Sequence, residues 1–578
     1  MTGGEVIARM LAKEGVDRVF GIIDGTYFGF YHNLRKHGIE LLSPRHETTA
    51  VHMAGAYARL TGRLGVCMAS TGPGAANALP GVAVENGEGN RVLLITSHRR
   101  TGITYPDRGG AYQYFNQTAV MKPMTKWSGS AQSHARIPEL TRRALRRSWQ
   151  GRPGVVHLDV PEDLLNTACE EPVFLEPHEY RRTAPIPPPR DLVERAADLL
   201  AGCAQPLIHA GSGVLHAGAF AGLQAVAEVL RAPVTTSWAA RGALPETSEL
   251  AVPMIHVELN HKVRNAADVV LTLGSRLGET DWWGKPPYWR RPSEQKMIQV
   301  DIDDDTLGCN KPTEIAVLAD AGLFLEMLLP ALRERRGRID LSSRNRFVEE
   351  IRLERQRQRQ ELDAALREDT DPMNPAHVAH TCRQVFDEDA IAVFDGGNTA
   401  VWGNFYHEVR VPNTQLGTHK FGMLGAGPGQ ALGAAAAFPG RQVYCVIGDG
   451  AMGFHPQEVE SAVRLGLKPV FLVLCDRQWG MVKFSQQFAV SQSKPDFGPQ
   501  DIVWADFHEI RFDKLAESMG AYGERIRRAA EIAPAIERSL ASGRCSVIHV
   551  DVDPVKHLWA PGLLHFKEMH QEPKAGAA

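Results

Sequence analysis

One stretch of the sequence, residues 448–480, limits the fold more than any other. An apolar strand pattern ends at Gly448-Asp449-Gly450, an amphipathic helical segment follows, and a second apolar run ends beside Asp476. Glycines at the carboxyl end of a strand let the backbone approach a ligand closely. Because the carboxyl ends of neighbouring parallel strands meet at one edge of a sheet, we expect Asp449 and Asp476 to face one pocket.

The chemistry of this predicted edge combines a metal site with an anion site. Carboxylate and carbonyl oxygens suit Mg²⁺, so the candidate metal ligands are Asp449, Asp476 and Gln478. Backbone N–H groups at the start of the following helix suit a phosphate, and the candidate residues are Gly448, Gly450, Ala451 and Met452. A metal beside a phosphate indicates a diphosphate cofactor. An ordinary nucleotide-fold turn with two surface acids is the alternative.

Strand and helix patterns alternate along the whole chain, which is typical of parallel α/β sheets. We therefore expect three consecutive doubly wound parallel-sheet domains. Residues 170–190 are rich in proline and residues 336–372 are dense in charge, so we interpret the first as an extended linker and the second as a helical linker. The predicted domains are residues 1–169, 191–335 and 373–553, followed by a tail, residues 554–578, that is a candidate lid over the pocket.

The composition excludes several classes of protein. Of 578 residues, 43% are hydrophobic and 23% are charged, which is ordinary for a globular protein, and the net charge of −3 gives no reason to expect a nucleic-acid partner. The sequence has no apolar run long enough to span a bilayer and no signal-peptide layout at its start. Its eight cysteines are scattered without a Cys-x-x-Cys pair, which favours reduced thiols and a cytoplasmic protein.

Several short motifs near the start of the chain occur in an order found in one enzyme family. They are Phe20-Gly21, Arg45-His46-Glu47, Gly72-Pro73-Gly74 and Gly110-Ala111-Tyr112-Gln113. Together with Gly448-Asp449-Gly450, they make the chain resemble the thiamine diphosphate enzymes of the acetolactate synthase, benzaldehyde lyase and 2-oxo acid decarboxylase type. The resemblance implies two cofactors, thiamine diphosphate and Mg²⁺. It also implies that the first domain binds the aminopyrimidine of the coenzyme and that the last binds its diphosphate and the metal.

The resemblance assigns roles to individual residues. Glu47 would be catalytic, with its carboxyl group on the aminopyrimidine, although such a glutamate is more commonly a first-turn acid that favours the helix dipole. Gln113 would contact the substrate, and its alternative is a polar core residue. Asn398 would contact the diphosphate, while Gly422 and Leu424 would grip the pyrimidine and keep the coenzyme bent.

The candidate substrate pocket draws on the first and last domains. Its residues are Thr26, Tyr27, Ser70, Trp479, Met481, Ser485 and Gln486. Two departures from the family bear on this assignment. Asp476 stands where the family has an asparagine, which adds a negative charge beside the diphosphate. Ser485-Gln486 stands where acetolactate synthases usually carry a Trp-Gln pair, and Trp479-Gly480 is more similar to benzaldehyde lyase.

The central domain of such relatives binds FAD, ADP or no nucleotide, and the sequence leaves these alternatives open. Gly211-Ser212-Gly213 follows a strand, but its spacing is looser than that of a dinucleotide motif. Residues 282–291 place aromatic side chains beside cations, which suits an adenine with phosphates or an acyl-CoA. A folded surface loop or a subunit contact is the favoured interpretation of this segment.

These observations predict a carboligase or lyase that makes or breaks a C–C bond next to a carbonyl group. Its small-molecule substrate would be a 2-oxo acid or a 2-hydroxy ketone. A 2-hydroxyacyl-CoA lyase or an oxalyl-CoA decarboxylase is the alternative, and an inactive regulatory subunit with this fold is a weaker one. In the family the coenzyme lies between the first domain of one subunit and the last domain of another, so we expect a homodimer or homotetramer.

Overall fold

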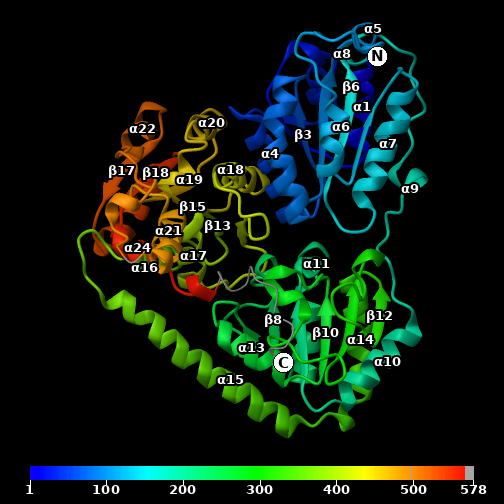
Figure 1. Ribbon diagram of the computed structural model, residues 1–578. Helices are drawn as coiled ribbons and strands as arrows, with labels where there is room; N and C mark the ends of the chain where they lie inside the picture. The colour runs from blue at the N-terminus through cyan, green and yellow to red at the C-terminus, as the bar shows by residue number, and fades with distance from the viewer. Residues whose placement is uncertain (495, 566–578) are drawn as a thin grey trace.

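The computed structural model describes residues 1–494 and 496–565 of the chain. Each third of the chain forms one six-stranded sheet, and every strand pair in the three sheets is parallel. Figure 1 shows three separate sheets, each covered by helices. The expected α/β fold, with three consecutive parallel-sheet domains, is therefore confirmed.

The first sheet has the strand order β2-β1-β3-β4-β6-β5. Its strands are β1 (Arg18–Gly21), β2 (Glu40–Leu42), β3 (Gly65–Ala69), β4 (Val92–His98), β5 (Trp127–Ser130) and β6 (Val155–Pro161). The helices of this region are α1 (Gly3–Lys13), α2 (Phe28–Leu34), α3 (Glu47–Thr61), α4 (Pro73–Glu88), α5 (Thr101–Thr104), α6 (Gln117–Met121), α7 (Arg136–Trp149) and α8 (Glu162–Asn166).

The central sheet has the order β12-β11-β10-β7-β8-β9. Its strands are β7 (Pro206–Ala210), β8 (Val234–Thr236), β9 (Ala251–Val252), β10 (Val269–Leu273), β11 (Lys296–Asp301) and β12 (Ile315–Leu318). Its helices are α10 (Arg190–Gly202), α11 (Ser212–His216), α12 (Phe220–Leu230), α13 (Val257–Ala266) and α14 (Ala321–Glu334).

The last sheet, β14-β13-β15-β16-β18-β17, repeats the order of the first. Its strands are β13 (Ile391–Asp395), β14 (Gln415–Gly417), β15 (Val443–Gly448), β16 (Val470–Cys475), β17 (Tyr522–Ile526) and β18 (Ser546–Asp551). Its helices are α16 (Ala376–Val385), α17 (Gly397–Tyr406), α18 (Gly427–Ala437), α19 (Asp449–Met452), α20 (Glu458–Arg464), α21 (Gly480–Ser493), α22 (Phe512–Ser518), α23 (Ile532–Ala541) and α24 (Pro554–Leu558).

In each sheet the strand order reverses beside the first strand of that domain. The reversal lies between β1 and β3 in the first sheet, between β7 and β10 in the central sheet, and between β13 and β15 in the last. In open parallel sheets the crevice beyond such a reversal is the place where ligands bind. The turn after β15 is Gly448-Asp449-Gly450, so the acidic motif lies at the reversal of the last sheet.

The segments between the sheets differ in structure. The proline-rich linker contains one short helix, α9 (Pro177–Tyr180), so it is not extended throughout as expected. The charge-dense linker forms α15 (Leu341–Leu362), which Figure 1 shows along the outside of the molecule between the central and last sheets. In residues 1–494 and 496–565 no helix combines the length and apolarity needed to cross a membrane. The end of the candidate lid, including Phe566 and His570, lies outside the described residues.

Helices α3 and α18 join the first domain to the last. Helix α3 begins after His46, whose side chain accepts the N–H of Thr48, and ends at Gly62 in the left-handed conformation. Small residues let the two helices approach closely: a Cβ on Gly433 would lie 2.4 Å from the carbonyl oxygen of Met53. Apolar residues of both helices belong to one buried cluster. The two domains therefore share a core.

Gly433→Ala is expected to destabilise the protein, although alanine is normally the better helix former by about 1 kcal/mol. The added methyl group would overlap the Met53 carbonyl, and overpacking of this kind costs about 1–3 kcal/mol. Urea unfolding followed by circular dichroism measures the shift in midpoint. Gly440→Ala is the matched control, because nothing lies within 4 Å of a Cβ at Gly440. An unchanged midpoint for Gly433→Ala would contradict the close packing.

Candidate functional site

Two buried carboxylates meet at the carboxyl ends of β15 and β16. Asp449 is 9% exposed and Asp476 is 6% exposed. The backbone N–H groups of Gly450 and Arg477 each donate to the Asp449 carboxylate at 2.7 Å. Burial, and then the negative charge of Asp476, raise the pKa of Asp449. A divalent cation bound by both carboxylates would relieve this repulsion, so the donor set fits the Mg²⁺ that the sequence implied.

Asp476 is surrounded by hydrogen-bond donors. The side-chain amide of Gln478 donates to its Oδ2 at 2.9 Å, and Nδ1 of His557 lies 2.6 Å from the same oxygen. The Gln478 amide also donates to the carbonyl of Pro554. Hydrogen bonds within the protein therefore already occupy this side chain. His557, on α24, was not among the residues predicted from sequence. Its position 81 residues after Asp476 left no local pattern by which to find it.

The neighbouring turn, after β13, contributes Asn398. This side chain is 3% exposed, and its amide nitrogen donates to the carbonyl of His557 at 3.1 Å. Its Oδ1 is buried and has no hydrogen-bond partner among the described residues. A Cβ on Gly396 would lie 3.3 Å from the backbone nitrogen of Gly448, so the turns after β13 and β15 face each other. Asn398 and the Gly448 turn therefore lie at the same edge of the last sheet.

Asp395 organises the segment that carries Gly422 and Leu424. Its carboxylate accepts the N–H groups of Gly425 at 3.0 Å and Gly427 at 2.7 Å, and burial raises its pKa to about 6. Gly422 is exposed with a φ of +69°, while Leu424 packs partly buried against the core shared by α3 and α18. Sequence reasoning missed Asp395, although its place at a strand end before a glycine pair was a usable signal.

In the first domain, Glu47 is the first residue of α3 and is 9% exposed. The side-chain amide of Asn77 donates to its Oε2 at 3.1 Å. A Cβ on Gly74 would lie 2.5 Å from Oγ of Ser70 and 3.2 Å from Oε1 of Glu47. Glu47 and Ser70 therefore both lie against Gly74, at the carboxyl edge of the first sheet.

A second glutamine, Gln117, holds the turn beside Gln113. Gln113 is exposed and has a φ of +53°, and its carbonyl oxygen would lie 2.4 Å from a Cβ on Gly72. Gln117 is 1% exposed; it accepts the N–H of Gly72 at 2.8 Å and donates to Asp159 at 2.7 Å. The sequence singled out Gln113 but not Gln117, because a buried amide leaves no periodic signal.

The candidate pocket residues of the first domain have different surroundings. The hydroxyl of Thr26 bonds to the carboxylate of Asp24 at 2.6 Å and to Ser97 at 2.5 Å. Tyr27 is 2% exposed in the apolar core, and its hydroxyl donates to the carbonyl of Ile22. The structure thus places the Tyr27 ring in the core.

The candidate pocket residues of the last domain lie at and after the end of β16. The Trp479 ring lies over Gly450, where a Cβ would be 2.7 Å from it. Met481 lies beside Gly397, and the Ser485 hydroxyl donates to the Met481 carbonyl at 2.8 Å. Both ends of the Gln486 amide bond to the backbone of Val503. Gln486 therefore anchors the segment around Val503 to α21.

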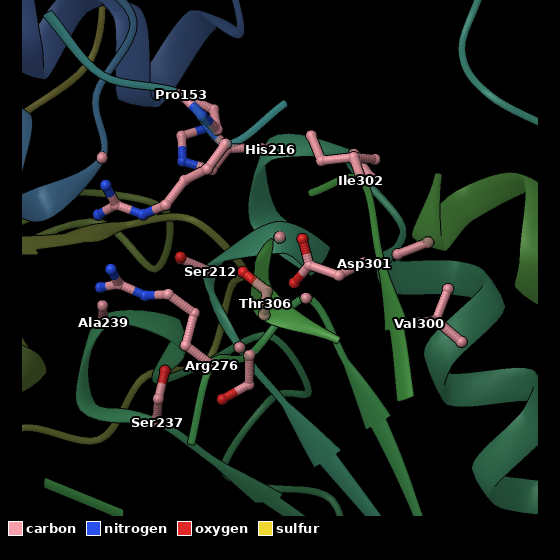
Figure 2. A pocket seen from close by; sticks show the side chains of 18 of the residues that line it. Pro153, Ser212, His216, Ser237, Ala239, Arg276, Val300, Asp301, Ile302 and Thr306 are labelled. Carbon is pink, nitrogen blue, oxygen red and sulfur yellow. The ribbon is translucent and has the colours of Figure 1, made fainter. Parts of the chain in front are cut away.

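A cavity of about 700 Å³ lies where the three domains meet. It opens beside the reversal of the central sheet, and Figure 2 shows Ser212, Arg276 and Asp301 gathered around it. A Cβ on Gly213 would lie 2.6 Å from the Cα of Gly274, so the turns after β7 and β10 touch.

Half-buried guanidinium groups give this cavity a cationic wall. Burial lowers the pKa values of Arg91 and Arg152 to about 10 and lowers that of Arg276. Burial also raises the pKa of Asp301, at the end of β11, to about 6. Arginines with an acid at a strand end suit an anion that also carries hydroxyl groups.

The aromatic segment 282–291 contributes two tryptophans to the interior. Trp282 is 1% exposed and Trp289 is fully buried, with its indole N–H donating to the Asp281 carbonyl at 2.8 Å. Trp283 lines the cavity. The two tryptophans are therefore interior, while Lys285, Pro287 and Arg291 of the same segment are exposed.

Comparison with known proteins agrees with this architecture. Residues 1–120, 193–328 and 395–550 match, in that order, the N-terminal TPP binding domain, the central domain and the C-terminal TPP binding domain of thiamine pyrophosphate enzymes. The chain is 29% identical to the probable acetolactate synthase large subunit of Methanocaldococcus jannaschii, over 96% of this chain and 93% of that protein. It is 28% identical to the acetolactate synthase isozyme 3 large subunit of Escherichia coli, over 97% and 96%. With all three of its domains matched in family order, the chain belongs to the thiamine pyrophosphate enzyme family.

Proposed function

We propose that this protein is a carboligase or lyase that uses thiamine diphosphate and Mg²⁺ to make or break a C–C bond next to a carbonyl group. The observation that carries the proposal is the buried pair Asp449 and Asp476 at the carboxyl ends of β15 and β16. The near full-length similarity to proteins named acetolactate synthase supports a 2-oxo acid or a 2-hydroxy ketone as the substrate.

The diphosphate end of the coenzyme would be held by the last domain. Asp449, Asp476 and the backbone carbonyl of Gln478 would ligate Mg²⁺. Asn398 and the N–H groups of residues 450–452 would contact the diphosphate. The Gln478 side chain is occupied by Asp476 and Pro554, which is why its backbone oxygen is the proposed ligand.

The pyrimidine end would be held by Glu47, Gly422 and Leu424. When bound, thiamine diphosphate supplies a nucleophilic carbon that adds to a carbonyl group. The Glu47 carboxyl group would hold a proton at the pyrimidine ring, and Leu424 would support the ring from below. Gln113, with Trp479 and Met481, would orient the substrate. Gln117 keeps the turn beside Gln113 in place through Gly72.

Self-association would complete the site, with the first domain of one subunit facing the last domain of another in a homodimer or homotetramer. Large apolar side chains are exposed near these edges, among them Tyr112 at 74%, Trp504 at 92% and Trp559 at 58%. Such exposure is typical of surfaces that associate. Equilibrium sedimentation tests this part of the proposal.

The proposed activity is tested by incubating the purified protein with thiamine diphosphate and Mg²⁺. Pyruvate, 2-hydroxy ketones and aromatic aldehydes form one substrate panel, and short acyl-CoA thioesters form the other. Turnover in the first panel that EDTA abolishes is the expected result. Turnover only in the second panel would identify an acyl-CoA enzyme, and no coenzyme binding at all would contradict the proposal.

The central cavity would bind a nucleoside diphosphate group, as ADP or within FAD. Its cationic wall and the Asp301 carboxyl group suit a diphosphate and a ribose. Arg276→Gln is expected to weaken ADP or FAD binding about 10-fold or more, because a charged hydrogen bond contributes about 1.5–3 kcal/mol. Isothermal titration measures the change, and Arg291→Gln, at an exposed site, is the control. Equal affinity in both variants would exclude Arg276 from the contact.

A further inference from the structure

Asp476 is embedded in donors that suit a carboxylate and oppose a carboxamide. Its Oδ2 faces Nε2 of Gln478 at 2.9 Å and Nδ1 of His557 at 2.6 Å. The amino group of Lys483 donates to Oε1 of Gln478 at 2.9 Å, which fixes the amide with its NH₂ toward Asp476. An asparagine at this position would place its own NH₂ against two donors, or would turn it toward the metal.

The orientation of His557 is equally determined. A carboxylate only accepts, so Nδ1 of His557 carries the proton that Asp476 receives. Nε2 lies 3.1 Å from the hydroxyl of Thr399 and forms a hydrogen bond with it. The His557 carbonyl accepts from Asn398 and from the indole of Trp402, each at 3.1 Å. His557 is 3% exposed, so these contacts are shielded from water.

We propose that His557 is a positioning residue of the coenzyme site. With the Gln478 side chain it binds Oδ2 of Asp476, so that Oδ1, which accepts the backbone N–H of Gln478 at 3.3 Å, is the oxygen turned toward the metal. The inference rests on the proposed function, because it concerns the residues that would hold Mg²⁺ and the diphosphate. Outer hydrogen bonds of this kind fix the orientation of a ligating carboxylate. This chain has aspartate where the family usually has asparagine. The donors from α24 and Gln478 fit the carboxylate that aspartate provides.

The segment after the last strand acquires a role through this contact. Helix α24 contacts three neighbours of the crevice: Asn398, Asp476 and Gln478. Farther along, the ring of Trp559 packs edge-on against Phe484 of α21 at 5.1 Å. The described part of the tail therefore packs against the residues proposed to hold the metal and the diphosphate.

Metal binding measured apart from turnover tests the proposal. Mg²⁺ is titrated into protein that is saturated with thiamine diphosphate, with the quenching of tryptophan fluorescence as the readout. His557→Leu is expected to raise the dissociation constant of Mg²⁺ about 10- to 100-fold. His557→Asn, which can keep a donor near the Nδ1 position, is expected to retain most of the affinity. His508→Leu, at an exposed site in the same domain, is the control.

Asp476→Asn gives the sharper test, because it restores the residue usual in the family. It is expected to weaken Mg²⁺ binding. Asp476→Asn combined with His557→Leu is expected to lose little further Mg²⁺ affinity, since both changes remove the same contact between Asp476 and His557. Tighter binding by Asp476→Asn, fully additive losses, or wild-type affinity in His557→Leu would overturn the inference. If the wild-type protein binds no thiamine diphosphate, the proposed function fails instead. If His557→Leu does not fold, the Mg²⁺ affinities of His557→Asn and Asp476→Asn test the proposal.

Discussion

Replacement of Glu47 by glutamine is expected to lower kcat by about 10²- to 10⁴-fold, the range typical of a lost acid–base group. Glutamine keeps the size of the side chain and its bond from Asn77, but it cannot hold and release a proton at the pyrimidine ring. The loss should fall on kcat, since the last domain is proposed to hold Mg²⁺ and the diphosphate. Steady-state kinetics and a coenzyme titration measure the two quantities separately.

The control for Glu47→Gln is Glu40→Gln, at an exposed position of β2 in the same domain. It should leave both kcat and coenzyme affinity unchanged. A Glu47→Gln variant with normal turnover would remove the assigned catalytic role. A variant that lost coenzyme binding as strongly as turnover would assign Glu47 to binding alone.

Asp449→Asn is expected to weaken metal-dependent coenzyme binding by more than the roughly 10- to 100-fold typical of changes outside the ligand shell. The substitution removes a charge that a divalent ion needs, and it places an NH₂ group against one of the backbone N–H groups of Gly450 and Arg477. Calorimetric titration of Mg²⁺ with thiamine diphosphate measures the change. Asp369→Asn, at an exposed position, is the control.

The same substitution should also change how stability depends on pH when no metal is added. The pKa of Asp449 is raised in the folded protein above its usual value of 3.8, by burial and by Asp476. The folded state then binds more protons than the unfolded state, so this group lowers stability as the pH rises from 3.8 through the raised pKa. The melting temperature of the wild type should therefore fall relative to Asp449→Asn between about pH 4 and pH 7, since the folded-state pKa is raised to about 7. Added Mg²⁺ should reverse the trend, and parallel pH profiles would contradict it.

Short-range patterns were enough to predict the chemistry of the strand ends. An apolar strand, a glycine-rich turn and an acid occupy consecutive positions at Asp449, and parallel pairing of β15 with β16 then brings Asp476 to the same edge. The beginning of α3 at Glu47 follows similarly from the local pattern. Two short edge strands escaped this reasoning: β9 has two residues and β14 has three.

The sequence alone determined the parallel α/β class, the strand ends that carry Glu47 and Asp449, and the family, because each depends on residues that are close in the chain. Only the tertiary structure decided what surrounds them: His557 on Asp476, Gln117 behind Gly72, and a cavity whose wall draws on all three domains. Such partners are joined by hydrogen bonds and burial across tens to hundreds of residues. Neither hydrophobic period nor turn chemistry records which distant side chain will meet a buried polar group.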